Sequence, residues 1–214
     1  LAGYSAQFES YSESFVDDVS GDFDLLGTTS SWDRPLPLEG RPESWDWPAD
    51  VQTDDFDGIG VVSLGAVRYA DAEDINADET ERVQLIRGID SGFAEHGGLP
   101  LHIWDPALGD DERSAWQAVA SNPNLAILDS SFGMEFQGQV DESSPFYQLT
   151  FSIGDSILAI DPENPSISKE FTVVGFLDEG SLWSAPGIWV NHLSSAEEFG
   201  ARYTRLYLSV PEGT

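Results

Sequence analysis

Few residues in this chain have the types and spacing that catalysis requires. Ser166-Ile167-Ser168-Lys169 has the S-x-x-K spacing of the penicillin-binding enzymes. In those enzymes the serine begins a helix, and S-D-N and K-T-G motifs complete the site. Here the serine follows Pro165 in a predicted loop between two strands, and neither partner motif occurs in the sequence. The spacing is therefore interpreted as a coincidence.

The three histidines do not have the spacing of a metal site. His96 and His102 are six residues apart, too far round a helix to bind one ion together, and the H-E-x-x-H pattern is absent. His192 stands just before a predicted helix. We interpret all three as structural or surface histidines. The chain has no cysteine, which excludes thiolate metal sites and cysteine nucleophiles.

Other chemical signatures are incomplete or missing. Asp55-Phe56-Asp57-Gly58 resembles part of a calcium loop, but the first ligand position falls on Thr53 and the twelfth, normally glutamate, on Leu64. The sequence has no G-x-S-x-G elbow, P-loop or dinucleotide fingerprint. We therefore predict no catalytic residues, no cofactor-binding residues and no metal ligands, and we expect that the protein is not an enzyme.

A segment over residues 32–50 combines tryptophan, proline and aspartate. Its proline density indicates an ordered loop rather than a helix or a strand. The tryptophans could form a platform on which sugar rings stack, or they could anchor a long loop by covering apolar surface. Both interpretations stay open. The tryptophans are Trp32, Trp45 and Trp47, beside the acids Asp33, Asp46 and Asp50.

The charge of the chain is strongly negative. Its 214 residues include 39 acidic and 9 basic side chains, a formal net charge of -30, and Lys169 is the only lysine. The acids are spread from Glu9 to Glu212, whereas a patch for cations or basic ligands would concentrate them in one place. We interpret the charge as halophilic adaptation, because molar salt screens the self-repulsion of such a surface. We expect low salt to unfold the domain and expect no nucleic-acid binding.

Composition and length indicate a folded globular domain. The chain is 40% hydrophobic and 12% aromatic, which is typical of a packed protein of one domain or two small subdomains. It has no apolar run long enough to cross a bilayer and no visible signal peptide. Because it starts at Leu1 rather than methionine, we expect it to be a piece of a longer protein.

Short strands and a few helices should position these residues. An aromatic stripe of Tyr4, Phe8, Tyr11 and Phe15 predicts a helix within residues 1–19. Val83 and Leu85 alternate with polar neighbours in a strand. Ser194 and Glu197 form a capping box, and Gly200 ends that helix. The predicted strands are 23–28, 59–69, 81–89, 125–128, 156–160, 171–177, 187–191 and 205–210, and the further helices are 91–100, 110–120 and 194–200.

Five motifs occur in an order that resembles a known family. They are AILDSSF, IGDSI, FTVVGFL, GIWVNHLSSAEEFG and RLYLSV, which begin at residues 126, 153, 171, 187 and 205. This order is similar to that of the MacB-like periplasmic core domain, the extracytoplasmic domain of FtsX-like ABC-transporter permeases. The match covers about the last ninety residues and extends more loosely back to Asp22. The segment Gln137–Gln148 departs from the family pattern as an insertion.

The resemblance implies an α+β fold of two subdomains. Residues 1–19 would continue a preceding membrane span as a helix. Residues 20–88 and 203–214 would form a mixed α/β layer that is closed by the C-terminal strand. Residues 89–202 would form an inserted strand-rich subdomain.

The resemblance also implies a non-enzymatic function. The domain would lie on the extracellular side of the cell membrane, tethered to the membrane part of the permease. It would work with a cytoplasmic ABC ATPase subunit and a second permease copy or homologue, and would couple ATP-driven motion to export or release of a lipoprotein, peptide or small amphiphile. The alternative is a secreted carbohydrate-binding or glycoside-cleaving domain that uses the tryptophans of residues 32–50.

Overall fold

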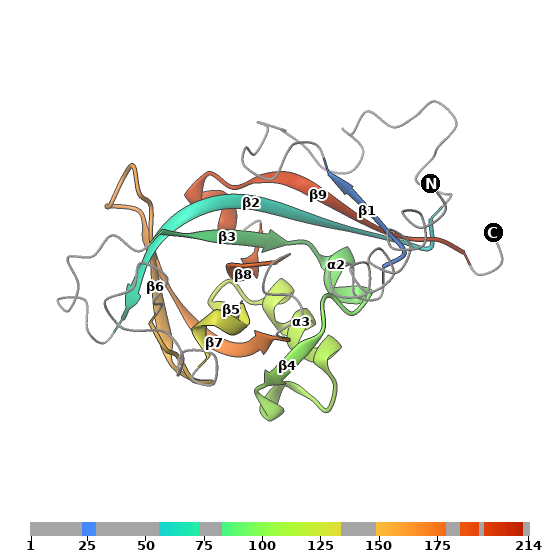
Figure 1. Ribbon diagram of the computed structural model, residues 1–214, viewed down its shortest axis with the longest axis horizontal. Coiled ribbons are helices and arrows are strands. Elements are labelled where there is room, and N and C mark those ends of the chain that lie inside the picture. The colour runs from blue at the N-terminus through green and yellow to red at the C-terminus, as the bar shows by residue number, and fades with distance from the viewer. Residues whose placement is uncertain are drawn as a thin grey trace, which may run out of the picture.

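The described chain forms one nine-stranded sheet with two short helices against it (Figure 1). The computed structural model describes residues 23–28, 56–72, 83–133, 149–178, 185–192 and 195–211. The strand order is β1-β9-β2-β3-β8-β5-β7-β4, and β6 pairs with both β2 and β7. The strands are β1 (Leu25–Thr28), β2 (Gly58–Asp71), β3 (Val83–Ile89), β4 (Leu101–Trp104), β5 (Leu125–Leu128), β6 (Ser156–Ile160), β7 (Ser168–Leu177), β8 (Ile188–Asn191) and β9 (Arg202–Ser209).

Pairing through β6 closes part of this sheet into a ring. The hydrogen-bonded circuit runs β2-β3-β8-β5-β7-β6 and returns to β2, so these six strands form a small closed barrel. Strand β2 makes the closure possible because it is long and curved (Figure 1). Its residues 58–64 pair with β9, 62–68 with β3 and 68–71 with β6. The β3–β8 and β5–β7 pairs are parallel, and the other pairs are antiparallel.

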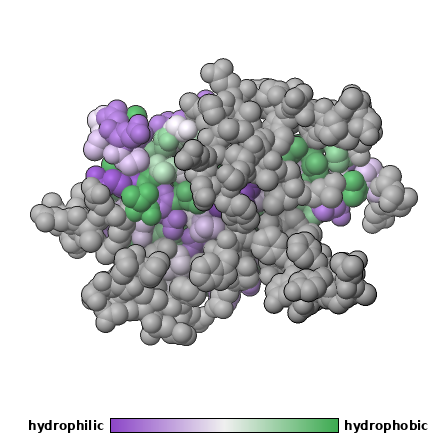
Figure 2. Space-filling model, turned by 45° about the horizontal axis from the view of Figure 1, so that its top comes forward, coloured by the Kyte–Doolittle hydropathy of each residue, from purple (hydrophilic) through white to green (hydrophobic). Residues whose placement is uncertain are grey.

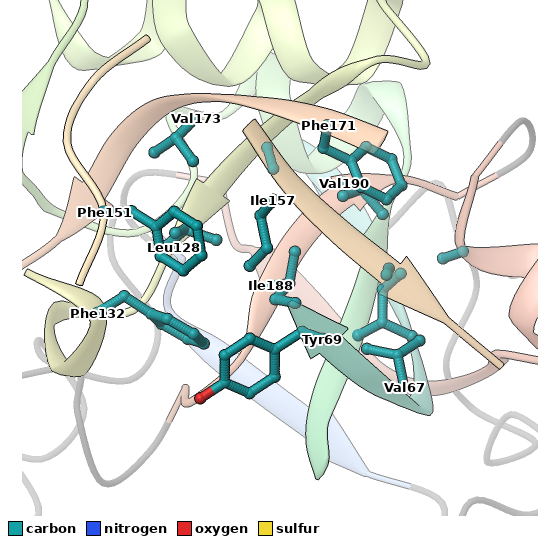
Figure 3. Packing of buried hydrophobic residues seen from close by; sticks show 14 of the residues in the cluster. Val67, Tyr69, Leu128, Phe132, Phe151, Ile157, Phe171, Val173, Ile188 and Val190 are labelled. Carbon is teal, nitrogen blue, oxygen red and sulfur yellow. The ribbon is translucent and has the colours of Figure 1, made fainter. Parts of the chain in front are cut away.

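Apolar side chains fill the inside of the barrel. In β6 the burial alternates, with Ile157 and Ala159 facing inward, and in β7 Phe171 and Val173 do the same. Figure 3 shows labelled side chains from several strands packed close together, and Tyr69 meets the ring of Phe132 edge-on at 5.1 Å. The interior is therefore packed core. The labelled members are Val67, Tyr69, Leu128, Phe132, Phe151, Ile157, Phe171, Val173, Ile188 and Val190.

A second apolar cluster joins the helices to the sheet. Helices α2 (Ser91–Glu95) and α3 (Glu112–Ser121) bury Phe93 and Trp116 against Trp189 of β8. The ring of Phe93 stacks on Trp189 at 5.6 Å and meets Trp116 edge-on at 5.3 Å. Each indole N–H also has an acceptor, since Trp116 donates to the Leu99 carbonyl and Trp189 to the Ala185 carbonyl. Both indoles are thereby buried without an unpaired donor.

Aspartate side chains cap the N-termini of the two helices. Asp90 caps α2 by accepting from the Phe93 amide at 2.9 Å, and the same oxygen accepts from the Val61 amide of β2 at 2.9 Å. One side chain therefore fixes α2 and ties it to the sheet. Burial raises the pKa of Asp90 against these hydrogen bonds. Asp111 caps α3, and Glu112 follows in the first turn, where a negative charge is favourable.

Most predicted elements are present, with shifted ends. The sequence does not predict β4 or the 3₁₀ turn η3 (Pro106–Leu108). The predicted last helix is the 3₁₀ turn η6 (Ala196–Phe199), which starts after Ser195 without a side-chain cap, whereas Ser194 lies outside the described residues. Gly200 ends this turn in the left-handed conformation, at φ 70°, as predicted. The turn η4 (Ser130–Phe132) follows β5.

The alternation at Val83 and Leu85 does not mark the buried face of β3. Val83 is 60% exposed, whereas Arg87 is 2% exposed. The reason is that β3 has a neighbour on each edge and an apolar cluster on each face. Its residues 86–89 are buried whichever way they point, and only the first residues of the strand reach solvent.

Strand pairing crosses the limits of the two predicted subdomains. β3 of the first pairs with β8 of the second, and β2 pairs with β6. The division into residues 20–88 with 203–214 and residues 89–202 stays a prediction. The predicted helix of residues 1–19 lies outside the described chain. Neither α2 nor α3, the described α-helices, has the length and apolarity of a membrane span.

Candidate functional site

Buried polar groups form two sets of contacts where strands of the two predicted subdomains meet. We call the whole set the buried polar junction and define it as Ser63, Arg87, Asp129, Pro186 and His192. Ser63 and Arg87 lie on β2 and β3, and the other three lie next to β5 and β8. The four polar side chains are each less than 9% exposed. Buried polar groups are costly unless paired, so their contacts identify what the junction does.

Arg87 crosses from β3 to the chain before β8. Its Nε donates to the Pro186 carbonyl at 2.7 Å. Its guanidinium carbon lies 5.1 Å from the ring centre of Trp189, the residue paired with it in register. Burial, and then the nearby positive charge of Arg205, lower the pKa of Arg87 to about 9. Burial is therefore unfavourable for the charged guanidinium, which nevertheless connects β3 to the chain before β8.

Asp129 fastens the end of β5 to the start of β8. One carboxylate oxygen accepts from the amide and the hydroxyl of Ser131, and the other accepts from the Gly187 amide at 2.5 Å. These bonds begin η4 and hold the chain next to Pro186. Burial raises the pKa of Asp129, and the hydrogen bonds together with the charge of Arg87 oppose that rise. Each oxygen thus has a structural partner.

Ser63 and His192 form a contact that resembles a nucleophile and its base. Ser63 Oγ lies 2.6 Å from His192 Nδ1 and 3.3 Å from the Gly88 carbonyl. However, Ser63 is 0% exposed, and a Cβ at Gly88 would lie only 2.4 Å from Ser63 Oγ. A substrate has no room to reach this hydroxyl. The pair instead holds the end of β8 against β2 and β3, together with the His192 amide, which donates to the Ile89 carbonyl.

The junction has the properties of a mechanical connection. Its contacts run from strands within residues 20–88 to segments within residues 89–202. Further bonds extend it to the end of α3, since Asn191 Nδ2 donates to the Ala120 carbonyl and Ser195 Oγ donates to the Pro123 carbonyl. Because these bonds are buried or partly buried, relative movement of the strands would leave polar groups unpaired.

Apart from His192, which lies in the junction, the residues that the sequence singles out lie elsewhere. Ser166 is exposed and donates to Asn164 Oδ1 at 2.6 Å, whereas Lys169 belongs to β7, with Nζ 4.0 Å from Glu198 Oε1. His96 packs its ring against Phe23 at 5.6 Å. His102 is exposed on β4. Among the described residues, no group of three or more histidines and acids could hold a metal ion. Trp32, Trp45, Trp47, Asp33, Asp46, Asp50, Thr53 and Asp55 lie outside the described chain.

The sequence analysis names His192, but it missed Arg87 and Asp129, for different reasons. An arginine in a strand suggests a solvent-facing side chain, so the burial of Arg87 depends on partners that are distant in sequence. For Asp129 a local signal exists, because aspartate followed by two serines after an apolar strand is typical of a capped turn.

We expect Asp129→Asn to destabilise the domain. The amide keeps one acceptor and places an NH₂ donor against either the Ser131 donors or the Gly187 amide, which leaves a buried donor unpaired. The free energy of unfolding, from denaturant titration in molar salt, should fall by about 1–3 kcal/mol. Asp111→Asn is the matched control and should change it less, because asparagine also caps helices well. Equal stability of the Asp129 variant and the wild type would contradict the proposed role of Asp129.

Comparisons with known proteins found a similarity in structure. No family model and no curated protein match the chain. A solved structure, the extracellular domain of the noncanonic ABC-type transporter YknZ from Gram-positive bacteria, is similar with a TM-score of 0.45 and 13% sequence identity. The alignment covers 75% of this chain and 68% of that one.

Proposed function

We propose that this chain is the extracellular domain of an FtsX-like ABC-transporter permease and that it works without catalysing a reaction. The order of the five sequence motifs from residue 126 to residue 210 supports the family. The geometry of the described chain supports the mechanical role. Under this proposal the domain faces the outside of the cell, and its partners are a cytoplasmic ATPase and a second permease copy.

The observation that carries the proposal is the arrangement of β1, β2 and β9 at one end of the sheet. The Asp24 amide donates to the Leu208 carbonyl at 2.9 Å, and the Val210 amide donates to the carboxylate of Asp24 at 2.8 Å. The Asp57 amide donates to the Ser209 carbonyl at 2.9 Å. The chain thus enters and leaves the described sheet side by side (Figure 1). A domain carried between two membrane helices needs this arrangement, although many domains share it.

A pull or a rotation applied at this end would pass into the whole sheet. β9 pairs with the first half of β2, and the other half of β2 pairs with β6 at the opposite end of the molecule (Figure 1). The buried polar junction holds β8 and β5 to the same body. In the transporter, ATP-driven motion of the membrane helices would therefore move the domain as one piece, against a second copy, to release a lipoprotein, peptide or small amphiphile.

The acidic surface fits a domain that works in concentrated salt. Exposed acids occur on many different elements, and Figure 2 shows hydrophilic described residues at both ends of one face. This spread supports the halophilic interpretation over a cation-binding patch. The exposed acids of the described chain are Asp24, Asp57, Glu95, Asp110, Asp111, Asp155, Glu163, Glu170, Asp178, Glu197 and Glu198.

The test of the transporter proposal uses the complete gene product in its own membrane. Because residues 1–214 include no cysteine, a single cysteine can be placed at Gln117, an exposed position on α3. A membrane-impermeant maleimide added to intact cells should label it. In vesicles, spin labels at Gln117 of two copies should change their separation when a trapped ATP state replaces the ADP state, because the domains move relative to each other.

The matched control carries both labels in one chain. Labels at Gln117 and Glu163, which are exposed on α3 and in the β6–β7 turn, should keep one separation in both nucleotide states because the domain moves as a rigid body. Labelling only after cell lysis, or distances between copies that ignore the nucleotide, would refute the transporter proposal. Tight binding of a glycan would favour the secreted carbohydrate-binding alternative.

Salt should stabilise the domain through screening. The screening length falls from about 30 Å at 0.01 M salt to about 3 Å at 1 M, so the repulsion within a chain of net charge -30 weakens steeply. Thermal unfolding followed by circular dichroism should show a melting temperature that rises continuously from dilute buffer to molar salt, with loss of the fold at the dilute end. Sodium and potassium should act alike if screening is the cause. A melting temperature independent of salt would contradict halophilic adaptation.

A further inference from the structure

One face of β2 and β9 carries a small apolar cluster of its own. Val61, Leu206 and Leu208 are 1%, 2% and 7% exposed. Val61 pairs in register with Leu206, and Ile59 pairs with Leu208, so these side chains lie together on the sheet. Every described member of the cluster comes from β2, from β9 or, in the case of Phe56, from just before β2. A sheet face reaches such low exposure only under a second layer, which the described residues of the cluster do not include.

Helix α2 covers the opposite face of the same strands. The ring of Tyr207 in β9 meets the ring of Phe93 in α2 edge-on at 5.1 Å. Gly60, the register partner of Tyr207, leaves so little room that a Cβ there would lie 2.7 Å from Phe93 Cα. Neighbouring residues of a strand point to opposite faces, so Val61 and Leu206 point away from α2. The two faces therefore differ, because one is filled by α2 and the other needs a cover from elsewhere.

The connection from β1 to β2 has to pass one of these two faces. Both strands pair antiparallel with β9, which lies between them, so they run parallel to each other (Figure 1). β1 ends at Thr28, opposite Arg205, whereas β2 begins at Gly58, opposite Ser209. Residues 29–55 thus start near one end of β9 and finish at the other, and connections between parallel strands cross over a face of the sheet. Because α2 fills one face, the apolar cluster lies on the face that is left to them.

The sequence of this connection includes a stretch suited to such a face. Within residues 29–55, Ser44–Pro48 reads Ser-Trp-Asp-Trp-Pro. A residue before proline is restricted to extended conformations, which favours an extended chain at Trp47. Alternate side chains of an extended chain point to opposite sides, so Trp45 and Trp47 would share one side and Asp46 would take the other. Such a stretch can present two indoles to an apolar sheet while its carboxylate faces the solvent.

We propose that Trp45 and Trp47 cover the apolar cluster of β2 and β9, so that residues 29–55 form a second layer on that face. This segment connects two strands that both pair with β9, which gives it a high effective concentration at the cluster. A second copy of the chain has no such link and carries the same net charge of -30. The two tryptophans are then part of the core and not a platform for sugars. The inference concerns the folded domain alone and is independent of the transporter proposal.

The first test measures how well the cluster is shielded from solvent. Residues 1–214 include no cysteine, so Val61→Cys introduces a single thiol in the cluster. The rate at which this thiol reacts with a maleimide is measured in molar salt, with and without the double substitution Trp45→Ala and Trp47→Ala. The thiol should be protected beside both tryptophans. Without them it should react at least about 100-fold faster, because truncating buried tryptophans to alanine removes contacts worth that factor.

The matched control is Ala115→Cys, on the other side of the sheet. Ala115 is 0% exposed on α3 and belongs to the cluster that joins the helices to the sheet, so its thiol should stay protected in both backgrounds. The proposal is overturned if Val61→Cys reacts quickly beside the intact tryptophans, or if it stays equally protected without them. Faster reaction at both positions would mean global unfolding, and the second measurement then decides.

The second measurement uses the wild-type chain and needs no folded variant. With methyl groups labelled, nuclear Overhauser effects should connect indole protons of the two tryptophans with methyl groups of Val61, Leu206 or Leu208. Effects between labelled and unlabelled chains in a mixed sample would assign the cover to a second copy instead. Contacts of these methyl groups with another segment of the chain, and with neither tryptophan, would also refute the proposal.

Discussion

Strand β2 hydrogen-bonds to three other strands along its length, and the rest of the described structure depends on that pairing. Its first half carries β9, its middle carries β3, and its last residues carry β6. Because β6 also pairs with β7, the ladder closes on itself and leaves no free edge between these six strands. Such a body resists bending, since any opening breaks several backbone hydrogen bonds at once. The stiffness that a mechanical role requires therefore follows from the topology.

The buried polar junction fixes how the strands of this sheet are arranged, but it also costs hydration free energy. A buried guanidinium and a buried carboxylate each lose hydration, which hydrogen bonds and ring contacts recover only in part. Burial accordingly lowers the pKa of Arg87 and raises that of Asp129. An apolar interior of equal volume would avoid these costs. The polar groups determine the position of β8 instead. The Pro186 carbonyl and the Gly187 amide have hydrogen-bond partners in only one position of β8 against β3 and β5.

The sequence predicts those elements whose signals are local. Strand β6 alternates between buried and half-buried residues, and the prolines of residues 162 and 165 end it, so its limits follow from periodicity and turn chemistry. Strand β4 was missed because four residues that include His102, directly before the Asp105-Pro106 turn, show no period. The burial of Arg87 was missed because it depends on Trp189 and on the Pro186 carbonyl, which no local pattern connects to β3. Closure of the barrel is likewise a property of pairings that are distant in sequence.

Native-state hydrogen exchange in molar salt tests most directly whether the described sheet is one rigid unit. Amides of β2 that face β9, amides that face β6 and the amides of β8 should share one free energy of opening, equal to that of global unfolding. When denaturant is added, the opening free energies of all these amides should fall with the same slope, because one cooperative unit opens. If β6, β7 and β8 instead opened together at a clearly lower free energy while β2 and β9 stayed protected, the domain would consist of two separable parts, and the rigid transmission of motion through β2 would be contradicted.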